Sequence, residues 1–218
     1  MKKKKNLYTG IGLLAAFALW TAAVSRIDVQ AIGPQGSAVG LAEINRAFHD
    51  FTGVHMSLYV VTDWLSLVPI AFAAGFALMG LVQWIGRKSI LKVDRSILVL
   101  GGFYLAVMAA YILFELFPVN FRPVLIDGYL EASYPSSTTM LVMCVMPTAL
   151  MQLRSRIKNT VLRRCAALAI SAFTAFMVIA RLISGVHWIT DIAAGALLSS
   201  GLVMLYHTGC ALAEGKPE

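Results

Sequence analysis

The chain has 218 residues, of which 59% are hydrophobic and only 13% are charged. Soluble domains carry about 25% charged residues, so the composition excludes an ordinary water-soluble fold and indicates a membrane protein. The net charge of +7 does not indicate a nucleic-acid partner, because the basic residues lie in short segments between apolar runs, where such residues set membrane orientation and contact anionic head groups.

Six apolar runs follow one another along the chain, and each predicts a helix that crosses the bilayer. They are expected at about 7–24, 56–84, 96–117, 137–153, 165–183 and 188–206. The fourth run is short, and Pro147 within it predicts a kink. The apolar runs are continuous rather than alternating, which favours helices over a barrel. We therefore expect an all-α fold, a six-helix transmembrane bundle that forms a single domain over 1–218.

The first run and the segment after it allow more than one interpretation. A run of lysines precedes residues 7–24, as in a signal peptide, but the run is long for one and 21–25 is a weak cleavage site. A retained first helix is therefore favoured. The segment 26–55 is the longest connection; it holds a turn signal at 33–36 and a stretch at 41–48 that fits a short interfacial amphipathic helix.

Basic residues are divided unevenly between the two sets of connecting segments, which predicts the orientation. Only four of the 18 lie on one side, namely Arg26, Arg46, Arg122 and Arg181. The other 14 lie on the opposite side, which the positive-inside rule assigns to the cytoplasm. We expect a multi-pass protein of the cell membrane with both termini cytoplasmic, and six helices fit this parity.

Three polar segments fall together on the sparsely basic, outward side. They are 120–123, which contains Arg122, then 134–139, which opens the fourth run with Pro-Ser-Ser, and 180–191, which contains Arg181. Each alone has a simple interpretation, as a head-group anchor, a helix cap or an interfacial histidine. Their coincidence on one side predicts a single polar site at the outer face.

These residue types suit a phosphate group. Arg122 and Arg181 each present a planar fork of donors that matches phosphate oxygens, and the helix that begins near Ser136 offers free N–H groups and a positive dipole end. His187 and Asp191 are four residues apart, so on a helix starting near His187 they share a face. A carboxylate placed there can hold one imidazole nitrogen as N–H and leave the other free to attack phosphorus.

The third segment resembles the type-2 phosphatidic acid phosphatase superfamily, whose core is shared with vanadium haloperoxidases. Its pattern Ser-Arg-x5-His-x3-Asp is matched by Arg181, His187 and Asp191, with Ala180 in place of serine. The resemblance covers about 96–206. It implies a phosphatase acting on lipid phosphates or diphosphates, without metal or other cofactor, in which His187 forms a phosphohistidine and Asp191 orients it. The phosphate-holding residues would be Arg122, Arg181, Ser136 and the backbone of Ser137.

The second motif, Pro-Ser-Gly-His in the family, reads Pro135-Ser136-Ser137-Thr138 here. The family histidine protonates the leaving group, and Thr138 cannot do so at neutral pH. An alkoxide leaving group without that acid should lose about 10² to 10⁴ in rate, whereas a phosphate leaving group, with a second pKa of about 6, needs little help. We therefore expect a lipid diphosphate, such as an undecaprenyl-type carrier, to be the better substrate.

The first motif, Lys-x6-Arg-Pro, retains Arg122-Pro123 but has Glu115 at the lysine position. Two roles are open for Glu115: it pairs with an arginine, or it stays protonated and substitutes for the missing acid. Asp63, inside the second run, is either functional or part of an interhelical hydrogen bond.

Two other functions remain open beside hydrolysis. A phosphotransferase would use the same site and pass the phosphoryl group to a lipid or sugar acceptor. A non-catalytic membrane protein that binds lipid phosphates would retain the arginines without turnover. All three interpretations share a membrane lipid phosphate or diphosphate as the partner.

Overall fold

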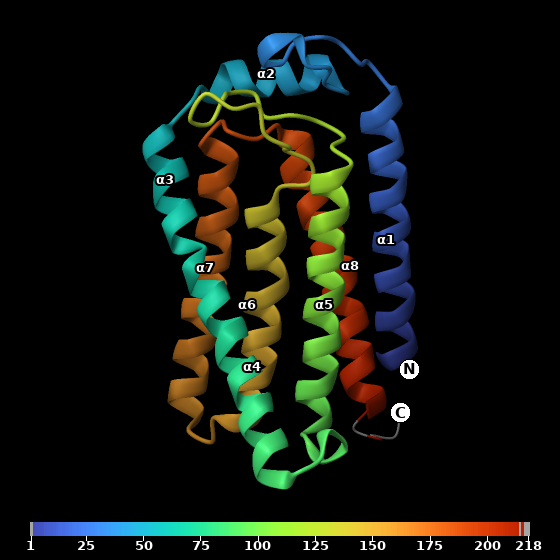
Figure 1. Cartoon of the computed structure of the whole chain (residues 1–218), viewed down its shortest axis with the longest axis vertical. Helices are drawn as coiled ribbons and strands as arrows, with labels where there is room; N and C mark the ends of the chain where they lie inside the picture. The colour runs from blue at the N-terminus through green and yellow to red at the C-terminus, as the bar shows by residue number, and fades with distance from the viewer. Residues whose placement is uncertain (1, 214, 216–218) are drawn as a thin grey trace.

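Long helices run side by side in the computed structural model, which describes residues 2–213 and 215 (Figure 1). A short helix lies across one end. The elements are α1 (Lys2–Arg26), η1 (Pro34–Gly36), α2 (Ala42–Thr52), α3 (Met56–Leu65), α4 (Leu67–Arg87), η2 (Ile90–Lys92), α5 (Arg95–Leu116), α6 (Ser137–Arg156), α7 (Thr160–Ile183) and α8 (Ile189–Ala213). The all-α prediction is confirmed for the described residues.

Each of the six predicted apolar runs is helical. The second run forms two helices, α3 and α4, which meet at Ser66. Five stretches of the described chain are long and apolar enough to cross a membrane, at 4–26, 56–87, 95–116, 160–183 and 189–213. The remaining predicted span, α6, is not among them. It contacts α4, α5, α7 and α8, and because protein surrounds it, it can bury polar side chains that a lipid-facing helix would not carry. The six-span count therefore stays a prediction.

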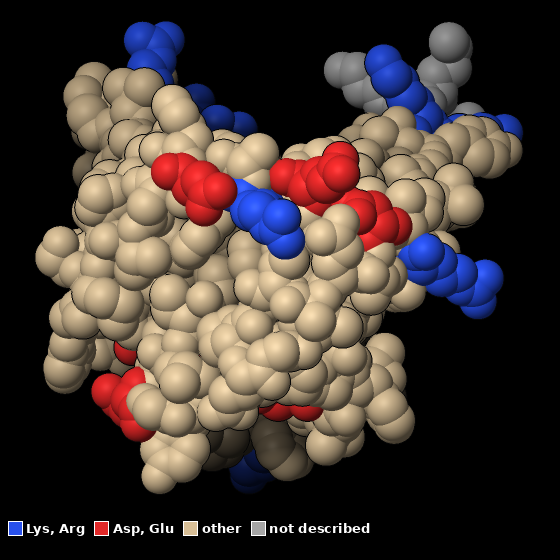
Figure 2. Space-filling model, turned by 90° about the horizontal axis from the view of Figure 1, so that it is seen from above, with Lys and Arg blue, Asp and Glu red and all other residues tan. Residues whose placement is uncertain are grey.

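The start of α1, the end of α8 and the α4–α5 and α6–α7 connections lie at one end of the bundle, and α2 lies across the other (Figure 1). We call the latter the α2 end; it comprises residues 27–55, 117–136 and 184–188. Seen from there, most of the surface is uncharged, with acidic groups flanking a basic one (Figure 2). Cytoplasmic termini remain a prediction, since the arrangement fixes which ends lie together and not which side they face.

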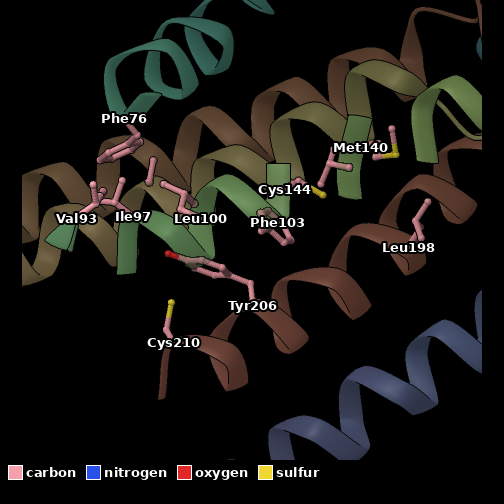
Figure 3. Packing of buried hydrophobic residues seen from close by; sticks show 12 residues of the cluster. Phe76, Val93, Ile97, Leu100, Phe103, Met140, Cys144, Leu198, Tyr206 and Cys210 are labelled. Carbon is pink, nitrogen blue, oxygen red and sulfur yellow. The ribbon is translucent and has the colours of Figure 1, made fainter. Parts of the chain in front are cut away.

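An apolar core joins α4, α5, α6 and α8 (Figure 3). Phe76, Leu100, Cys144 and Tyr206 are among its buried members. The hydroxyl of Tyr206 accepts a hydrogen bond of 2.6 Å from the Gln152 amide, so the polar end of this aromatic side chain has a partner inside the bundle. The core holds α6 and α8 together, and these two helices begin with the polar segments of the predicted site.

Helix α1 packs along α8, and its last turns contact residues near the α2 end. Close approach depends on Gly201, where an added Cβ would lie 2.9 Å from the side chain of Leu14. Near the top of α1, the Trp20 indole donates to the carbonyl of Thr190 at 3.1 Å, and Thr21 Oγ1 lies 2.7 Å from the Tyr134 hydroxyl. The N-terminal helix thus supports two segments that carry predicted site residues.

Candidate active site

The three polar segments predicted to share one side of the membrane meet at the α2 end. Arg122, Arg181 and His187 are almost fully buried there, with 7%, 1% and 3% of their surface exposed. Burying two guanidinium groups beside an imidazole is costly unless partners compensate the charge. An anion bound here would supply the compensating charge.

The α5–α6 connection places Arg122 through a short antiparallel ladder. The Arg122 amide donates to the Glu131 carbonyl at 3.0 Å, and the Ser133 amide donates to the Asn120 carbonyl at 2.9 Å. Side chains alternate along such a pair of extended segments, so Arg122 and Glu131 form one facing pair and Asn120 and Ser133 the next. The first pair is an ion pair, with Arg122 Nε 2.9 Å from Glu131 Oε2.

A tight turn between α7 and α8 carries His187. Gly185 within it has φ +68°, and a Cβ there would lie only 2.0 Å from the Gly53 carbonyl oxygen, so no other residue fits without movement. Because α8 begins at Ile189, His187 precedes the helix. The expectation that His187 and Asp191 share a helix face is thus wrong, although the turn still brings them together.

The two arginines converge on the histidine and on one aromatic ring. Arg122 Nη1 donates to His187 Nε2 at 3.2 Å. The guanidinium carbons of Arg181 and Arg122 lie 4.6 and 5.8 Å from the centre of the Tyr59 ring. Arg181 also donates to Thr62 Oγ1 at 3.1 Å, while its buried Nε has no hydrogen-bond partner. An unsatisfied guanidinium N–H beside a second arginine suits a phosphate oxygen.

Asp191 is fully buried and accepts hydrogen bonds at both carboxylate oxygens. Oδ2 accepts from the Trp188 amide at 3.0 Å, an arrangement that also caps α8, and Oδ1 accepts from the Asn120 side chain at 3.3 Å. The Ser133 hydroxyl donates to Oδ2 as well. Asp191 is therefore held rigidly from the helix start and from the α5–α6 connection.

The Ser133 hydroxyl lies between Asp191 and His187 and contacts both side chains. Asp191 Oδ2 lies 3.8 Å from His187 Nδ1, too far for a hydrogen bond, whereas Ser133 Oγ lies 3.0 Å from Nδ1. Sequence reasoning expected a direct contact between carboxylate and imidazole. The difference arises because His187 sits in the turn before α8 and not on the helix.

The environment of His187 favours its neutral form. Burial is the larger cause, and the positive charges of Arg122 and Arg181 add to it; together they hold the pKa of His187 well below 6.5. A neutral imidazole keeps a lone pair on one ring nitrogen. Since Arg122 can only donate, that lone pair lies on Nε2, toward the two arginines.

The second-motif residues occupy the start of α6. Ser136 is the N-cap, and its hydroxyl accepts from the Thr139 amide at 3.4 Å. Its own amide donates to the Asp191 carbonyl at 3.1 Å. Ser137 is partly exposed and lines a small pocket together with Glu115. Thr138 is buried in the first turn of the helix. The Ser136 amide is thus committed to structure, which leaves its O–H and the Ser137 amide as donors for a ligand.

Glu115 and Asp63, the two acidic residues for which the sequence left alternative roles open, lie at exposed positions. Glu115 makes no ion pair with an arginine among the described residues; the acidic partner of Arg122 is Glu131. Asp63 is also exposed, on α3. Over the described part of the chain, no group of three His, Cys, Asp or Glu side chains is placed to hold a metal ion.

Sequence reasoning assigned no role to Ser133, Asn120 or Tyr59. Asn120 falls at an unspecified position of the first motif and Ser133 lies two residues before the second, and their proximity depends on a pairing of extended segments too short to show a period. Tyr59 lies in an apolar run, where a tyrosine is ordinary. A polar residue two positions before each of the Arg-Pro and Pro-Ser segments was the available signal.

A family model described as the PAP2 superfamily matches residues 102–210, which is half of the chain. The chain belongs to the PAP2 superfamily. This confirms the resemblance to type-2 phosphatidic acid phosphatases. The matched residues of this PAP2 protein include Arg122, Ser136, Arg181, His187 and Asp191.

A solved structure has the same fold. It is described as the crystal structure of the first transmembrane PAP2 type phosphatidylglycerolphosphate phosphatase, from Bacillus subtilis. The two chains are 19% identical with a TM-score of 0.59, and the match covers 92% of this chain and 94% of that one. No match was found among curated proteins. With its apolar helices and this transmembrane neighbour, the PAP2 protein described here is a multi-pass membrane protein.

Proposed function

We propose that this PAP2 protein hydrolyses lipid phosphates through a phosphohistidine on His187, and that a lipid diphosphate of polyprenyl type is the preferred substrate. The observation that carries the proposal is the 3.2 Å contact from Arg122 Nη1 to His187 Nε2. It directs the nucleophilic lone pair of the imidazole at the place where the guanidinium groups can hold a phosphate.

The first step transfers the phosphoryl group to the enzyme. His187 Nε2 attacks phosphorus, a nitrogen–phosphorus bond forms, and the bond to the leaving oxygen breaks with its electron pair. Arg122 and Arg181 supply the positive charge that stabilises the phosphoryl oxygens in the transition state, so no metal ion or cofactor enters the proposed reaction. The Ser136 hydroxyl and the Ser137 amide provide further donors at the start of α6.

The second step releases inorganic phosphate. Water attacks the phosphohistidine, the nitrogen–phosphorus bond breaks, and its electron pair returns to Nε2. The proton lost by the water leaves with the phosphate or passes to solvent. From a lipid diphosphate the products are one lipid monophosphate and one inorganic phosphate, and His187 is restored to its neutral form.

The substrate preference rests on Thr138, which stands where the family has a histidine. A lipid monophosphate leaving group departs as a stable dianion near neutral pH, whereas a glycerol or polyprenol oxygen requires a proton at that moment. Equal rates of cleavage of phosphatidic acid and of a polyprenyl diphosphate would refute this preference and leave the phosphohistidine mechanism intact.

The proposed site faces outward. Only four of the 18 basic residues lie in the α2 end or in the last turns of the helices that lead into it, and the positive-inside rule places the other end in the cytoplasm. Labelling of single cysteines introduced at the exposed positions Asp50 and Lys88 with an impermeant reagent, in intact cells, tests this orientation. We expect labelling at position 50 and not at position 88.

The function is tested by phosphate release from a short-chain polyprenyl diphosphate in detergent, without added metal. Wild-type protein is compared with His187→Ala and with His207→Ala, a matched histidine on an exposed site of α8 that contacts Asn6. We expect release by the wild type and by the His207 variant, and loss of release with His187→Ala. Full activity of the His187 variant would refute the proposed nucleophile.

The two alternative functions give different results in the same assay. A phosphotransferase would release phosphate only slowly until a lipid or sugar acceptor was added, because the phosphoryl group would wait on His187. A non-catalytic protein would bind the diphosphate, with binding reduced by loss of Arg122, but would release no phosphate under any condition.

A further inference from the structure

We propose that Ser133 is a positioning residue of this site: its hydroxyl connects Asp191 to His187 and holds the imidazole in the tautomer that attacks phosphorus. The inference rests on the proposed function. It is carried by one juxtaposition. Ser133 Oγ donates to Asp191 Oδ2 and lies 3.0 Å from His187 Nδ1, while the carboxylate itself is 3.8 Å from that nitrogen.

The direction of each hydrogen bond follows from counting protons. A hydroxyl has one proton to donate. Asp191 Oδ2 also accepts from the Trp188 amide, and Oδ1 accepts from Asn120, so the carboxylate acts as an acceptor in all its contacts. The Ser133 proton therefore points to Asp191. Its oxygen is left to accept, which requires the His187 Nδ1 to carry a proton.

The contact on the opposite side of the ring leads to the same tautomer. Arg122 Nη1 lies 3.2 Å from Nε2 and can only donate, so Nε2 must be unprotonated. Two independent neighbours, an obligate donor at Nε2 and an acceptor at Nδ1, thus agree. A neutral imidazole with its proton on Nδ1 has its nucleophilic lone pair where the two arginines converge.

Ser133 is well fixed for this role. Only 2% of its surface is exposed, and its amide donates to the Asn120 carbonyl at 2.9 Å. The following residue, Tyr134, is fully buried, and its hydroxyl lies 2.7 Å from Thr21 Oγ1 on α1. The hydroxyl of Ser133 is therefore placed by the backbone of the α5–α6 connection and by α1, not by the ligand.

The hydrogen bonds that link Asp191, Ser133 and His187 matter most during attack. As the bond between Nε2 and phosphorus forms, the ring gains positive charge while Nδ1 keeps its proton. The Ser133 oxygen accepts a hydrogen bond from that N–H, and the Asp191 carboxylate polarises the Ser133 hydroxyl. Together they stabilise the positive charge on the ring, as a directly bonded carboxylate does in other histidine-dependent enzymes. Losing this hydrogen bond should raise the barrier to the chemical step and leave ground-state binding of the phosphate unchanged.

Kinetics of Ser133→Ala and Ser133→Thr test the inference, with Ser199→Ala as the control. Ser199 is a fully buried serine whose hydroxyl bonds the Met140 carbonyl, away from the site. We expect Ser133→Ala to lower kcat by about 10- to 100-fold with KM changed less than about twofold, since a hydrogen bond to a charged group is lost. Ser133→Thr, which keeps the hydroxyl, should recover most of that loss, and Ser199→Ala should match the wild type.

Nitrogen-15 NMR of the wild-type protein gives a second readout that does not depend on the folding of a Ser133 variant. The ring signals of His187, assigned by their loss in His187→Ala, should show a protonated Nδ1 and a bare Nε2 at pH 7.5. The opposite tautomer would overturn the inference. A wild-type kcat in Ser133→Ala, together with an inactive His187→Ala, would also overturn the inference. The proposed function would still stand in that case. Turnover by His187→Ala would instead refute the proposed function.

Discussion

Glu131 forms an ion pair with Arg122, the arginine that also contacts His187. The Glu131 carboxylate lies 2.9 Å from Arg122 Nε and is 42% exposed, while the arginine side chain is 9% exposed. A phosphate that uses the Arg122 fork must either displace this carboxylate or bind beside it. Glu131 thus neutralises part of the charge of the site, and a phosphate that binds Arg122 would compete with it.

Replacing Glu131 by glutamine should therefore tighten substrate binding. An exposed ion pair is worth about 0.2 to 1 kcal/mol, so we expect KM for a lipid diphosphate to fall by about 1.4- to 5-fold with little change in kcat. Steady-state kinetics in one detergent at fixed ionic strength measure the change. Glu43→Gln, at an exposed position on α2, removes the same charge from the same end of the bundle. An equal fall in KM for both variants would attribute the effect to net charge and not to the ion pair.

The depressed pKa of His187 predicts the acid limb of activity. Burial and the two arginines favour the neutral imidazole, so the attacking form persists as pH falls through 6.5 and is lost only at the lower folded-state pKa. We expect the fall in kcat/KM that protonation of His187 causes to be centred below pH 6.5. The ionisation of the substrate is measured by phosphorus-31 NMR in the same detergent, and the pH profile of kcat/KM is corrected for it. A limb centred at pH 6.5 or above would contradict the expectation.

The same shift has a consequence for stability. Below pH 6.5 the unfolded chain binds a proton at His187 that the folded protein excludes, so the free energy of unfolding should fall as pH drops from 6.5 toward the folded-state pKa. Thermal unfolding in detergent between pH 7.5 and 5 measures this slope. The slope should be smaller in His187→Gln, which cannot take up the proton.

The long helices were predictable because their ends are marked by charge. Arg95 opens α5 and Arg87 closes α4, so apolar runs and helices coincide within a few residues. The break between α3 and α4 at Ser66 was missed, because one serine in a long apolar run carries no turn signal. The sequence of α6 is less apolar than that of the other long helices, because α6 is surrounded by protein and not by lipid.

The site was predictable only in part. Arg122, Arg181 and His187 could be grouped because their segments fall on one side of the membrane, a relationship that topology fixes without coordinates. The contact of Ser133 with Asp191 and His187 could not be predicted. It depends on backbone pairing within the α5–α6 connection and on the position of His187 before the start of α8. A spacing of four predicts a shared helix face only when both residues are helical.

Introducing the missing acid should shift the substrate preference. In Thr138→His, a histidine occupies the family position in the first turn of α6. We expect cleavage of phosphatidic acid to rise by about 10- to 100-fold, toward the lower end of what general acid catalysis supplies, with a much smaller rise for a lipid diphosphate. Thr138→Gln, similar in length but without an acidic proton, should leave the ratio of the two rates unchanged. The same ratio in all three proteins would show that protonation of the leaving group does not limit the reaction.

Gly185 sets the position of His187, and its replacement should disturb both folding and activity. At φ +68°, alanine is strained, and its Cβ would meet the Gly53 carbonyl oxygen at 2.0 Å. We expect Gly185→Ala to destabilise the protein by about 2 kcal/mol or more. The turn must also move, and a displacement of the nucleophile by about 1 Å costs on the order of 10²-fold in kcat.

Gly101→Ala is the matched control for this change. Gly101 lies within α5, and an added Cβ there meets nothing within 4 Å. Alanine favours a helix over glycine, so we expect its thermal midpoint in detergent to stay the same or rise, with wild-type kcat. Gly185→Ala should lower both. Equal midpoints and equal kcat in the two variants would mean that the α7–α8 turn relaxes around a side chain, and that His187 is held in place by its hydrogen bonds to Ser133 and Arg122 alone.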